Sequence, residues 1–200
     1  MNNYLSELTI VIVTYKTNFE ILNNCLQSID PKVKILIVEN SKKFENEDKV
    51  KNKFSNIKVL CTGSNLGMGV ANNFGLSKVE TKYALILNPD VICKKDFFEN
   101  INIYLDRKVD FTVIGSQYDD SSDYKPAFFF NDKVFDYNME MDENFLQKVD
   151  WVVGCSILID LEKFKSNEIF DQKYFLFYEE TDLCLGLKKK GYQVYSSKKL

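Results

Sequence analysis

Short runs of apolar residues alternate with amphipathic segments through the first 116 residues of the chain. Runs such as LTIVIVTY at 8–15 are typical of strands buried on both faces of a sheet. Between the runs, apolar residues recur at helical spacing. The predicted strands are 8–15, 34–40, 57–62, 83–90 and 110–116, and the predicted helices are 19–29, 44–54, 65–79 and 96–108. This alternation predicts an α/β fold with a mostly parallel sheet and helices on both of its faces.

The pattern changes near residue 117. Residues 117–150 are rich in Asp, Ser, Tyr and Phe without a regular period, which predicts loops and short irregular strands. A strand interrupted at Gly154 is predicted over 150–160, and a helix that Gly191 would end is predicted within 170–192. Residues 192–197 predict a last short strand. Because no repeat or linker divides the chain, we expect a single domain over 1–200 with two unlike halves.

Composition excludes several classes of function. The chain has no histidine, which removes His-based triads, His-ligated zinc and His general bases. Its 26 basic residues include one arginine, Arg107, and are offset by 29 acidic ones, so we expect no dedicated nucleic-acid binding. The five cysteines form no CxxC pair, which favours buried, reduced thiols.

Targeting signals are also missing from the pattern. Neither a signal peptide nor an apolar run of transmembrane length is evident, so we expect a cytoplasmic protein. Peripheral association with the inner face of a membrane stays open as an alternative.

The first four predicted strands all lead into polar residues. In an open α/β sheet, ligands bind outside the carboxyl ends of the strands. Four consecutive ends with carboxylate, amide or hydroxyl groups therefore suggest a ligand with a base, a sugar and phosphates. These ends are Thr14-Tyr15, Glu39-Asn40-Ser41, Asn65-Leu66-Gly67 and Asn88-Pro89-Asp90.

Two of these ends have competing interpretations. Asp90 offers a carboxylate for Mg²⁺ or Mn²⁺, which would neutralise a diphosphate in a chain so poor in arginine, but it would equally serve as a cap for the following turn or helix. The turn Asn65-Leu-Gly67-Met-Gly69 resembles a phosphate-binding turn, yet residue 72 is Asn where a third glycine would stand. A flexible start of a helix is the better interpretation of that turn.

Glu179, Glu180 and Asp182 form the densest acidic cluster of the second half, directly after the mostly aromatic KYFLFY. Carboxylates beside aromatic surface tend to have raised pKa values, which suits a general base. Acids in the first turn of a helix are also favoured by the helix dipole. The helix dipole does not explain the aromatic run before the acids, so we favour a functional interpretation of the acidic cluster. For Trp151, core packing and stacking against a sugar both remain open.

Six motifs in order carry a resemblance to a known family. TIVIVTYK, LIVENS, NLGMGVANN, LILNPDV, WVVGCSILI and YFLFYEETDLCLGLKKKGY resemble those of family 2 glycosyltransferases, over residues 8–195. The chain is most similar to the bacterial rhamnosyltransferase-like branch, which has NPD where relatives have DxD. The resemblance implies a GT-A fold, an inverting mechanism, a divalent metal and a nucleoside-diphosphate sugar donor. Among donors it favours dTDP-rhamnose, with UDP-hexoses next, and it implies a glycan or lipid-linked acceptor in cell-surface polysaccharide synthesis.

The resemblance also assigns roles by position. It implies that residues 1–116 bind the nucleotide sugar and residues 117–200 form the acceptor side. On the donor side, Thr14, Tyr15 and Glu39 would line the nucleoside pocket, Asn65, Gly67 and Asn72 would form its wall beside the ribose, Asn88 would face the ribose or diphosphate, and Asp90 would bind the metal. Glu180 stands at the position of the catalytic base, and the remaining acceptor-side candidates are Trp151, Gly154, Glu179 and Asp182.

Three departures from the family pattern bear on activity. Glu39 and Glu180 stand where aspartate is commoner, and the sequence stops at Leu200, before a stretch in which relatives supply a histidine and acceptor contacts. One alternative is therefore a nucleotide-sugar-binding GT-A domain with little activity. An NAD-dependent oxidoreductase would share the alternating sheet, but the broken glycine fingerprint counts against it.

Overall fold

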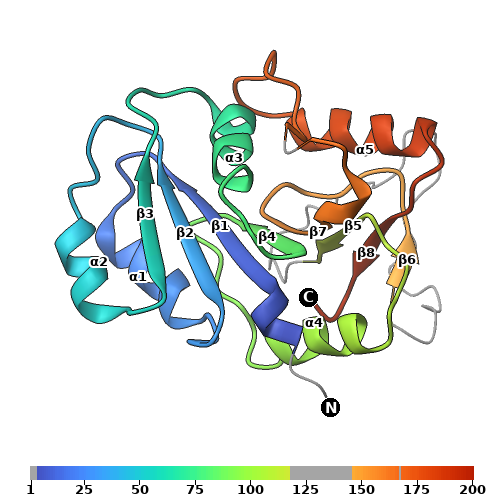
Figure 1. The fold of residues 1–200 in the computed structure, drawn as a ribbon, viewed down its shortest axis with the longest axis horizontal. Helices are drawn as coiled ribbons and strands as arrows, with labels where there is room; N and C mark the ends of the chain where they lie inside the picture. Colours follow the sequence, from blue (N-terminus) through green and yellow to red (C-terminus); the bar gives the residue numbers. More distant parts are fainter. Residues whose placement is uncertain (1–3, 118–145, 167) are drawn as a thin grey trace, which may run out of the picture.

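A computed structural model describes residues 4–117, 146–166 and 168–200. Those residues form one eight-stranded sheet in the order β3-β2-β1-β4-β7-β5-β8-β6, with helices packed on it (Figure 1). The strands are β1 (Leu8–Thr14), β2 (Lys34–Glu39), β3 (Ile57–Cys61), β4 (Tyr83–Leu87), β5 (Val113–Ser116), β6 (Leu146–Lys148), β7 (Ser156–Asp160) and β8 (Val194–Ser197). The helices are α1 (Phe19–Gln27), α2 (Glu47–Lys53), α3 (Met68–Leu76), α4 (Phe97–Asp106) and α5 (Glu179–Lys189), with short 3₁₀ turns η1 (Tyr4–Glu7) and η2 (Leu161–Lys163).

Strands β3, β2, β1 and β4 are parallel, as predicted. Every residue of β1 is buried, because helices cover both faces of the sheet. Alternate β1 side chains enter two cores: Ile10 and Ile12 pack in the one that contains α1 and α4 residues, and Val11 and Val13 in the one that contains α3 and α5 residues. The register places Thr14 opposite Glu39, so the polar strand ends are level with one another.

Helix α3 lies unusually close to this sheet. A Cβ atom at Gly75 would stand 2.5 Å from Cγ1 of Val11 and 2.8 Å from Cγ2 of Val38, so only glycine fits there. At its other end, α3 begins after Gly67, whose φ of +83° is a backbone conformation that side chains disfavour. The helix is thereby fixed both against the strands and at the edge where they end.

The second half of the sheet is mixed rather than parallel. Strand β7 inserts between β4 and β5 and is antiparallel to both, and β6 is antiparallel to β8. The predicted strand over 150–160 is therefore only partly right, since pairing begins at Ser156. Val152 instead packs onto the face of β5, where the position of a Cβ on Gly115 falls 2.3 Å from Val152 Cβ.

The last predicted elements are confirmed. The helix predicted within 170–192 is α5, and Gly191, with φ +81°, follows its end at Lys189. The predicted final strand is β8. The loops expected over 117–150 fall largely on 118–145, outside the described residues, although 146–148 form the short strand β6.

Candidate active site

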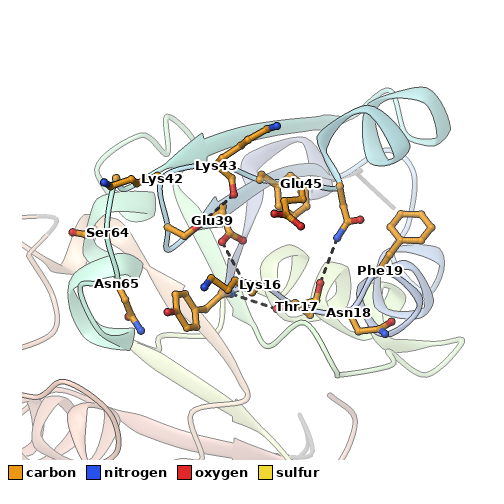
Figure 2. A pocket seen from close by; sticks show the side chains of 15 residues that line it. Lys16, Thr17, Asn18, Phe19, Glu39, Lys42, Lys43, Glu45, Ser64 and Asn65 are labelled. Carbon is orange, nitrogen blue, oxygen red and sulfur yellow. Dashed lines mark hydrogen bonds between the residues drawn. The ribbon is translucent and has the colours of Figure 1, made fainter.

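A cavity of about 570 Å³ opens at the carboxyl ends of β1, β2 and β3 (Figure 2). Residues 15–19, 39, 41–46 and 63–65 line it. Three of the predicted donor-side residues, Tyr15, Glu39 and Asn65, thus meet in one space. Its volume falls within the range of about 300–1,000 Å³ that is usual for small-ligand sites.

Glu39 is the buried carboxylate of this cavity, with only 1% of its surface exposed. Its Oε2 accepts a hydrogen bond from the Thr14 hydroxyl at 2.7 Å, and its Oε1 accepts one from the Lys16 backbone N–H at 3.3 Å. These two bonds fix the orientation of the carboxylate. Thr14 itself is fully buried and does not line the cavity, so it contributes by positioning Glu39.

Asn40 holds the turn that forms the cavity's far wall, a role that the sequence analysis did not assign. Its Oδ1 accepts hydrogen bonds from the Leu66 backbone N–H at 3.0 Å and the Thr62 hydroxyl at 3.1 Å. Its Nδ2 donates to Asn65 Oδ1 at 3.0 Å and to the Gly67 carbonyl at 3.1 Å. The available signal was the position of Asn40, directly after a buried strand.

The central backbone N–H groups of the glycine turn, at residues 66–68, already have protein partners. The Gly67 N–H donates to Asn65 Oδ1 at 3.1 Å, and the Met68 N–H donates to the carbonyl of Phe175 at 2.8 Å. The Leu66 N–H donates to Asn40 Oδ1. Asn65 lines the cavity, whereas Gly67 does not and instead precedes the first residue of α3.

Asn72 and Asn73 lie side by side on α3 but differ in their contacts. Asn72 is buried, does not line the cavity, and its Oδ1 has no hydrogen-bond partner within the described part of the chain. Asn73 Oδ1 accepts from the N–H groups of Ile169 at 2.9 Å and Phe170 at 3.0 Å, and its Nδ2 donates to the Phe170 carbonyl at 2.8 Å. Asn73 thus ties α3 to the segment before α5. Two adjacent asparagines in an apolar helix were the only sequence signal for this.

Asp90 lies on a turn held at both sides. The Asn88 N–H donates to the Cys155 carbonyl at 2.8 Å, and the Val91 N–H donates to the Asn88 carbonyl at 3.2 Å. Asp90 is exposed and, together with Asn88 and Cys155, lines a second cavity of about 610 Å³. The next helix, α4, begins after Asp96, so Asp90 is not its cap.

The surroundings of Asp90 suit a hard cation. Burial raises the pKa of the Cys25 thiol to about 12, with added repulsion from Cys93 and Asp90, and burial also raises the pKa values of Cys93 and Cys155 to about 11. The Asp90 carboxylate is an oxygen ligand of the kind that Mg²⁺ and Mn²⁺ prefer. No cluster of three His, Cys, Asp or Glu side chains suited to a metal occurs in the described ranges.

Glu180 stands in the first turn of α5, directly against Gly154. A Cβ on Gly154 would lie 3.6 Å from Glu180 Cγ and 3.7 Å from its Cδ, which is ordinary contact. The pKa of the next residue, Cys155, is raised by burial and to a smaller extent by the negative charge of Asp90. The segment 154–155 therefore lies between the candidate metal ligand and the candidate base.

The other two acids of the cluster point elsewhere. Glu179 is buried against α3, where a Cβ on Gly69 would lie 3.6 Å from Glu179 Cβ, and burial raises the pKa of its carboxyl. Asp182 Oδ1 accepts a hydrogen bond from the Tyr174 hydroxyl at 3.5 Å. The aromatic side chains of 175–178 are exposed, so within the cluster it is Glu179 that is desolvated, and α3 contributes to its burial.

Trp151 is half-buried and packs against the core that contains α3 and α5 residues. This contact accounts for the residue through packing. Stacking of Trp151 against a sugar stays a prediction.

Residues 9–166 match the family model described as glycosyl transferase family 2. The chain belongs to this family. It is similar to the rhamnosyltransferase WbbL of Escherichia coli (strain K12), with 28% identity over a 155-residue alignment and coverage of 67% of this chain and 59% of WbbL. It is also similar to the dTDP-rhamnosyl transferase RfbF of Shigella flexneri, with 22% identity over 197 residues, 95% of this chain and 66% of RfbF. The chain thus spans about 59–66% of the length of these relatives.

Solved structures share the fold. The S. aureus protein TarS, residues 1–349, aligns with a TM-score of 0.62 and 14% identity over 96% of this chain and 60% of that one. The mannosyltransferase PcManGT from Pyrobaculum calidifontis, in complex with GDP-Man and Mn²⁺, aligns with a TM-score of 0.64 and 11% identity over 96% and 55%. The predicted GT-A fold and the resemblance to the rhamnosyltransferase-like branch of family 2 are confirmed. None of the helices in the described ranges is long and apolar enough to cross a membrane.

Proposed function

We propose that this chain is an inverting, metal-dependent glycosyltransferase that uses a nucleoside-diphosphate sugar. Its acceptor would be a glycan or a lipid-linked glycan in cell-surface polysaccharide synthesis, reached in the cytoplasm at the inner face of the membrane. Family membership supports the class of reaction. The names of the two relatives favour dTDP-rhamnose as donor, with UDP-hexoses next.

The observation that carries the proposal is the cavity around Glu39. A buried, fixed carboxylate at its base suits the N–H or hydroxyl donors of a nucleoside, because a carboxylate only accepts hydrogen bonds. The ring of Tyr15, 50% exposed at the rim, offers a face for stacking. Three lysines, Lys16, Lys42 and Lys43, outnumber the two carboxylates, Glu39 and Glu45, in the same lining, which favours an anionic ligand (Figure 2).

The chemistry would take place across residues 154–155. The Glu180 carboxylate would accept the proton of the acceptor hydroxyl while that oxygen bonds to C1 of the sugar. The bond from C1 to the diphosphate oxygen would break on the opposite face, which inverts the configuration. Asp90 would hold a divalent cation, which would stabilise the negative charge on the leaving group.

Binding measurements test the donor side directly. Thermal unfolding with dTDP-, UDP- and GDP-sugars, with Mg²⁺ or Mn²⁺, should show the largest shift for dTDP-rhamnose. A ligand at 100 times its dissociation constant stabilises a protein by about 2.7 kcal/mol, which is readily measured. Stabilisation by GDP-mannose alone would overturn the choice of donor.

Asp90→Asn tests the metal. The substitution keeps the shape and removes the charge, so metal-dependent nucleoside-diphosphate binding measured by calorimetry should weaken sharply while the Tm is unchanged. Asp96→Asn is the matched control, because Asp96 is also exposed and lies six residues further on. Equal affinity for Asp90→Asn and wild type, or no effect of EDTA on the wild type, would contradict the assignment.

The alternative function is that of a nucleotide-sugar-binding GT-A domain with little turnover of its own. Donor binding without sugar transfer to any acceptor would favour this alternative. Family membership sets the oxidoreductase alternative aside.

A further inference from the structure

Four consecutive large apolar residues are exposed just before α5. Phe175 is 57% exposed, Leu176 50%, Phe177 68% and Tyr178 70%. This segment, residues 175–178, is called the tip, and in Figure 1 the chain around it projects beyond α3 and the start of α5. Leu66, 37% exposed, adjoins the tip, because its neighbour Gly67 lies directly against the Phe175 ring and carbonyl. Contiguous exposed apolar surface of this kind marks an interaction site.

The backbone holds the rings outward. Phe177 and Tyr178 have φ values of +68° and +70°, a left-handed conformation that is costly for residues with side chains and persists only where the surroundings impose it. The tip is tied down at both ends: Met68 donates to the Phe175 carbonyl at 2.8 Å, and the Asp182 N–H donates to the Tyr178 carbonyl at 2.9 Å. Its exposure is therefore built into the fold.

The chemistry of the tip points to lipid rather than to a saccharide or a protein. Of its four side chains only Tyr178 carries a polar atom, whereas a sugar needs hydrogen-bond partners for its hydroxyls. Three partly exposed aromatic rings and a leucine offer about 500 Å² of surface, less than the roughly 800 Å² per partner of a stable protein interface. Apolar and aromatic side chains on a projecting segment are what inserts at the boundary of a bilayer.

Lysines and acids are both present beside the tip, and two acids, Glu179 and Glu180, directly follow it. The cavity of about 860 Å³ next to the tip, lined in part by residues 168–173, contains the charged residues Lys163, Lys165, Glu168, Asp171, Lys173, Asp182 and Lys190. Lys163 is paired with Asp110 at 2.6 Å. Attraction to anionic lipid should therefore add little, and the apolar side chains should dominate binding.

We propose that the tip, together with Leu66, inserts into the surface of a lipid bilayer. Tyr178 precedes the candidate base Glu180 by two residues, so insertion would bring that carboxylate close to a hydroxyl presented at the membrane surface. This last step rests on the proposed transferase function. Lipid binding itself does not.

The test is sedimentation of the purified full chain with phosphatidylcholine vesicles, without nucleotide or sugar. The wild type should bind, and Leu176→Ser/Phe177→Ser should bind at least about tenfold more weakly because it loses its inserted apolar surface. Ile21→Ser is the matched control, since Ile21 is 47% exposed on α1, away from the tip, and should bind as the wild type does. Phe177→Trp should retain binding, because tryptophan suits the membrane interface. Added phosphatidylglycerol should change binding less than the double substitution does.

Three results would overturn the proposal. The first is a wild type that binds vesicles neither with nor without phosphatidylglycerol, the second is equal binding of the wild type and the double variant, and the third is a wild type that is a dimer beside a double variant that is a monomer. The last would identify a second copy of the chain as the occupant. Thermal unfolding checks that each variant is folded. Vesicle binding without any donor-induced thermal shift would contradict the transferase proposal and still support lipid binding by the tip. The two proposals can therefore fail separately.

Discussion

The two halves of the sheet along its strand order, called its two sides below, are built in different ways. In β3-β2-β1-β4, parallel strands joined through helices lie next to one another, and their ends supply the cavity around Glu39. In β7-β5-β8-β6, neighbours come from distant parts of the sequence, and the segments around these strands supply Gly154 and Glu180. The candidate binding groups thus come from successive β-α units, whereas the candidate base is positioned by long-range packing.

The two sides are joined by the β4–β7 pairing and by a few contacts outside that ladder. Asn73 holds the segment before α5, Met68 donates to Phe175, and the Asn88 N–H donates to Cys155. Substitutions on either side, or at these contacts, should therefore separate binding, catalysis and stability.

The largest expected effect separates catalysis from binding. Glu180→Gln should leave donor affinity unchanged and reduce sugar transfer by about 10²–10⁴-fold, roughly 3–5 kcal/mol of barrier, because the acceptor hydroxyl loses its base. Initial rates and donor calorimetry on the same preparation measure both. Glu180→Asp, with a carboxylate one methylene shorter, should retain measurable activity.

Asp182→Asn is the control for Glu180, because Asp182 lies in the same first turn of α5 but contacts Tyr174. It should keep most of the transfer rate. If Asp182→Asn transferred no sugar while Glu180→Gln kept a nearly normal transfer rate, the base would be Asp182 and not Glu180.

The next effect concerns the join between the two sides. Asn73→Ala removes three hydrogen bonds and leaves backbone groups of Ile169 and Phe170 without them, so it should cost about 2–3 kcal/mol of unfolding free energy. For a chain of this length that is a fall in Tm of about 4–12 °C. Asn72→Ala, next to it and equally buried but with an unpartnered Oδ1, should cost clearly less. Equal losses would mean that the bonds of Asn73 do not hold the two sides together.

The smallest effect is a pH dependence at Glu179. Burial raises the pKa of this carboxyl above its ordinary 4.5, so the folded chain holds the proton more tightly than the unfolded chain does. The buried charge therefore destabilises the fold above the raised pKa, and this penalty disappears below about 4.5. Glu179→Gln should be more stable than wild type at neutral pH, with the difference fading as the pH falls.

Glu20→Gln is the control for Glu179, because Glu20 also lies in the first turn of a helix but is exposed. It should show no such gain. A constant difference between Glu179→Gln and wild type at every pH would argue against a buried charge.

The sequence predicted the first side better than the second for a physical reason. Strands such as β1 are buried on both faces and flanked by amphipathic helices, so local periodicity was enough to find them and their polar ends. The place of β7 between β4 and β5 depends on pairing across more than 60 residues, which no local pattern records. Likewise, that Glu179 rather than Glu180 is buried depends on packing against α3 at Gly69.

The site residues show the same division between what local sequence predicts and what long-range contacts determine. Tyr15, Glu39 and Asn65 meet as expected because parallel strands end at one edge. Thr14 was expected to line the pocket, but its hydroxyl is directed at Glu39, a bond that depends on the register between β1 and β2. Asn73 was missed, because its partners, Ile169 and Phe170, lie almost 100 residues further on. The roles assigned to Asp90, Glu180 and the other site residues stay predictions.

The insertion of β7 also bears on how the chain is made. On the ribosome, β4 can pair with β1 as soon as it emerges, but its other edge stays open until Ser156–Asp160 arrive. At about 5–20 residues per second, the roughly 70 intervening residues take about 4–14 seconds to synthesise. Throughout that time the apolar strand YALIL presents unpaired backbone groups to neighbouring nascent chains. The strand order that places β7 between β4 and β5 thus leaves one edge of β4 open during part of synthesis.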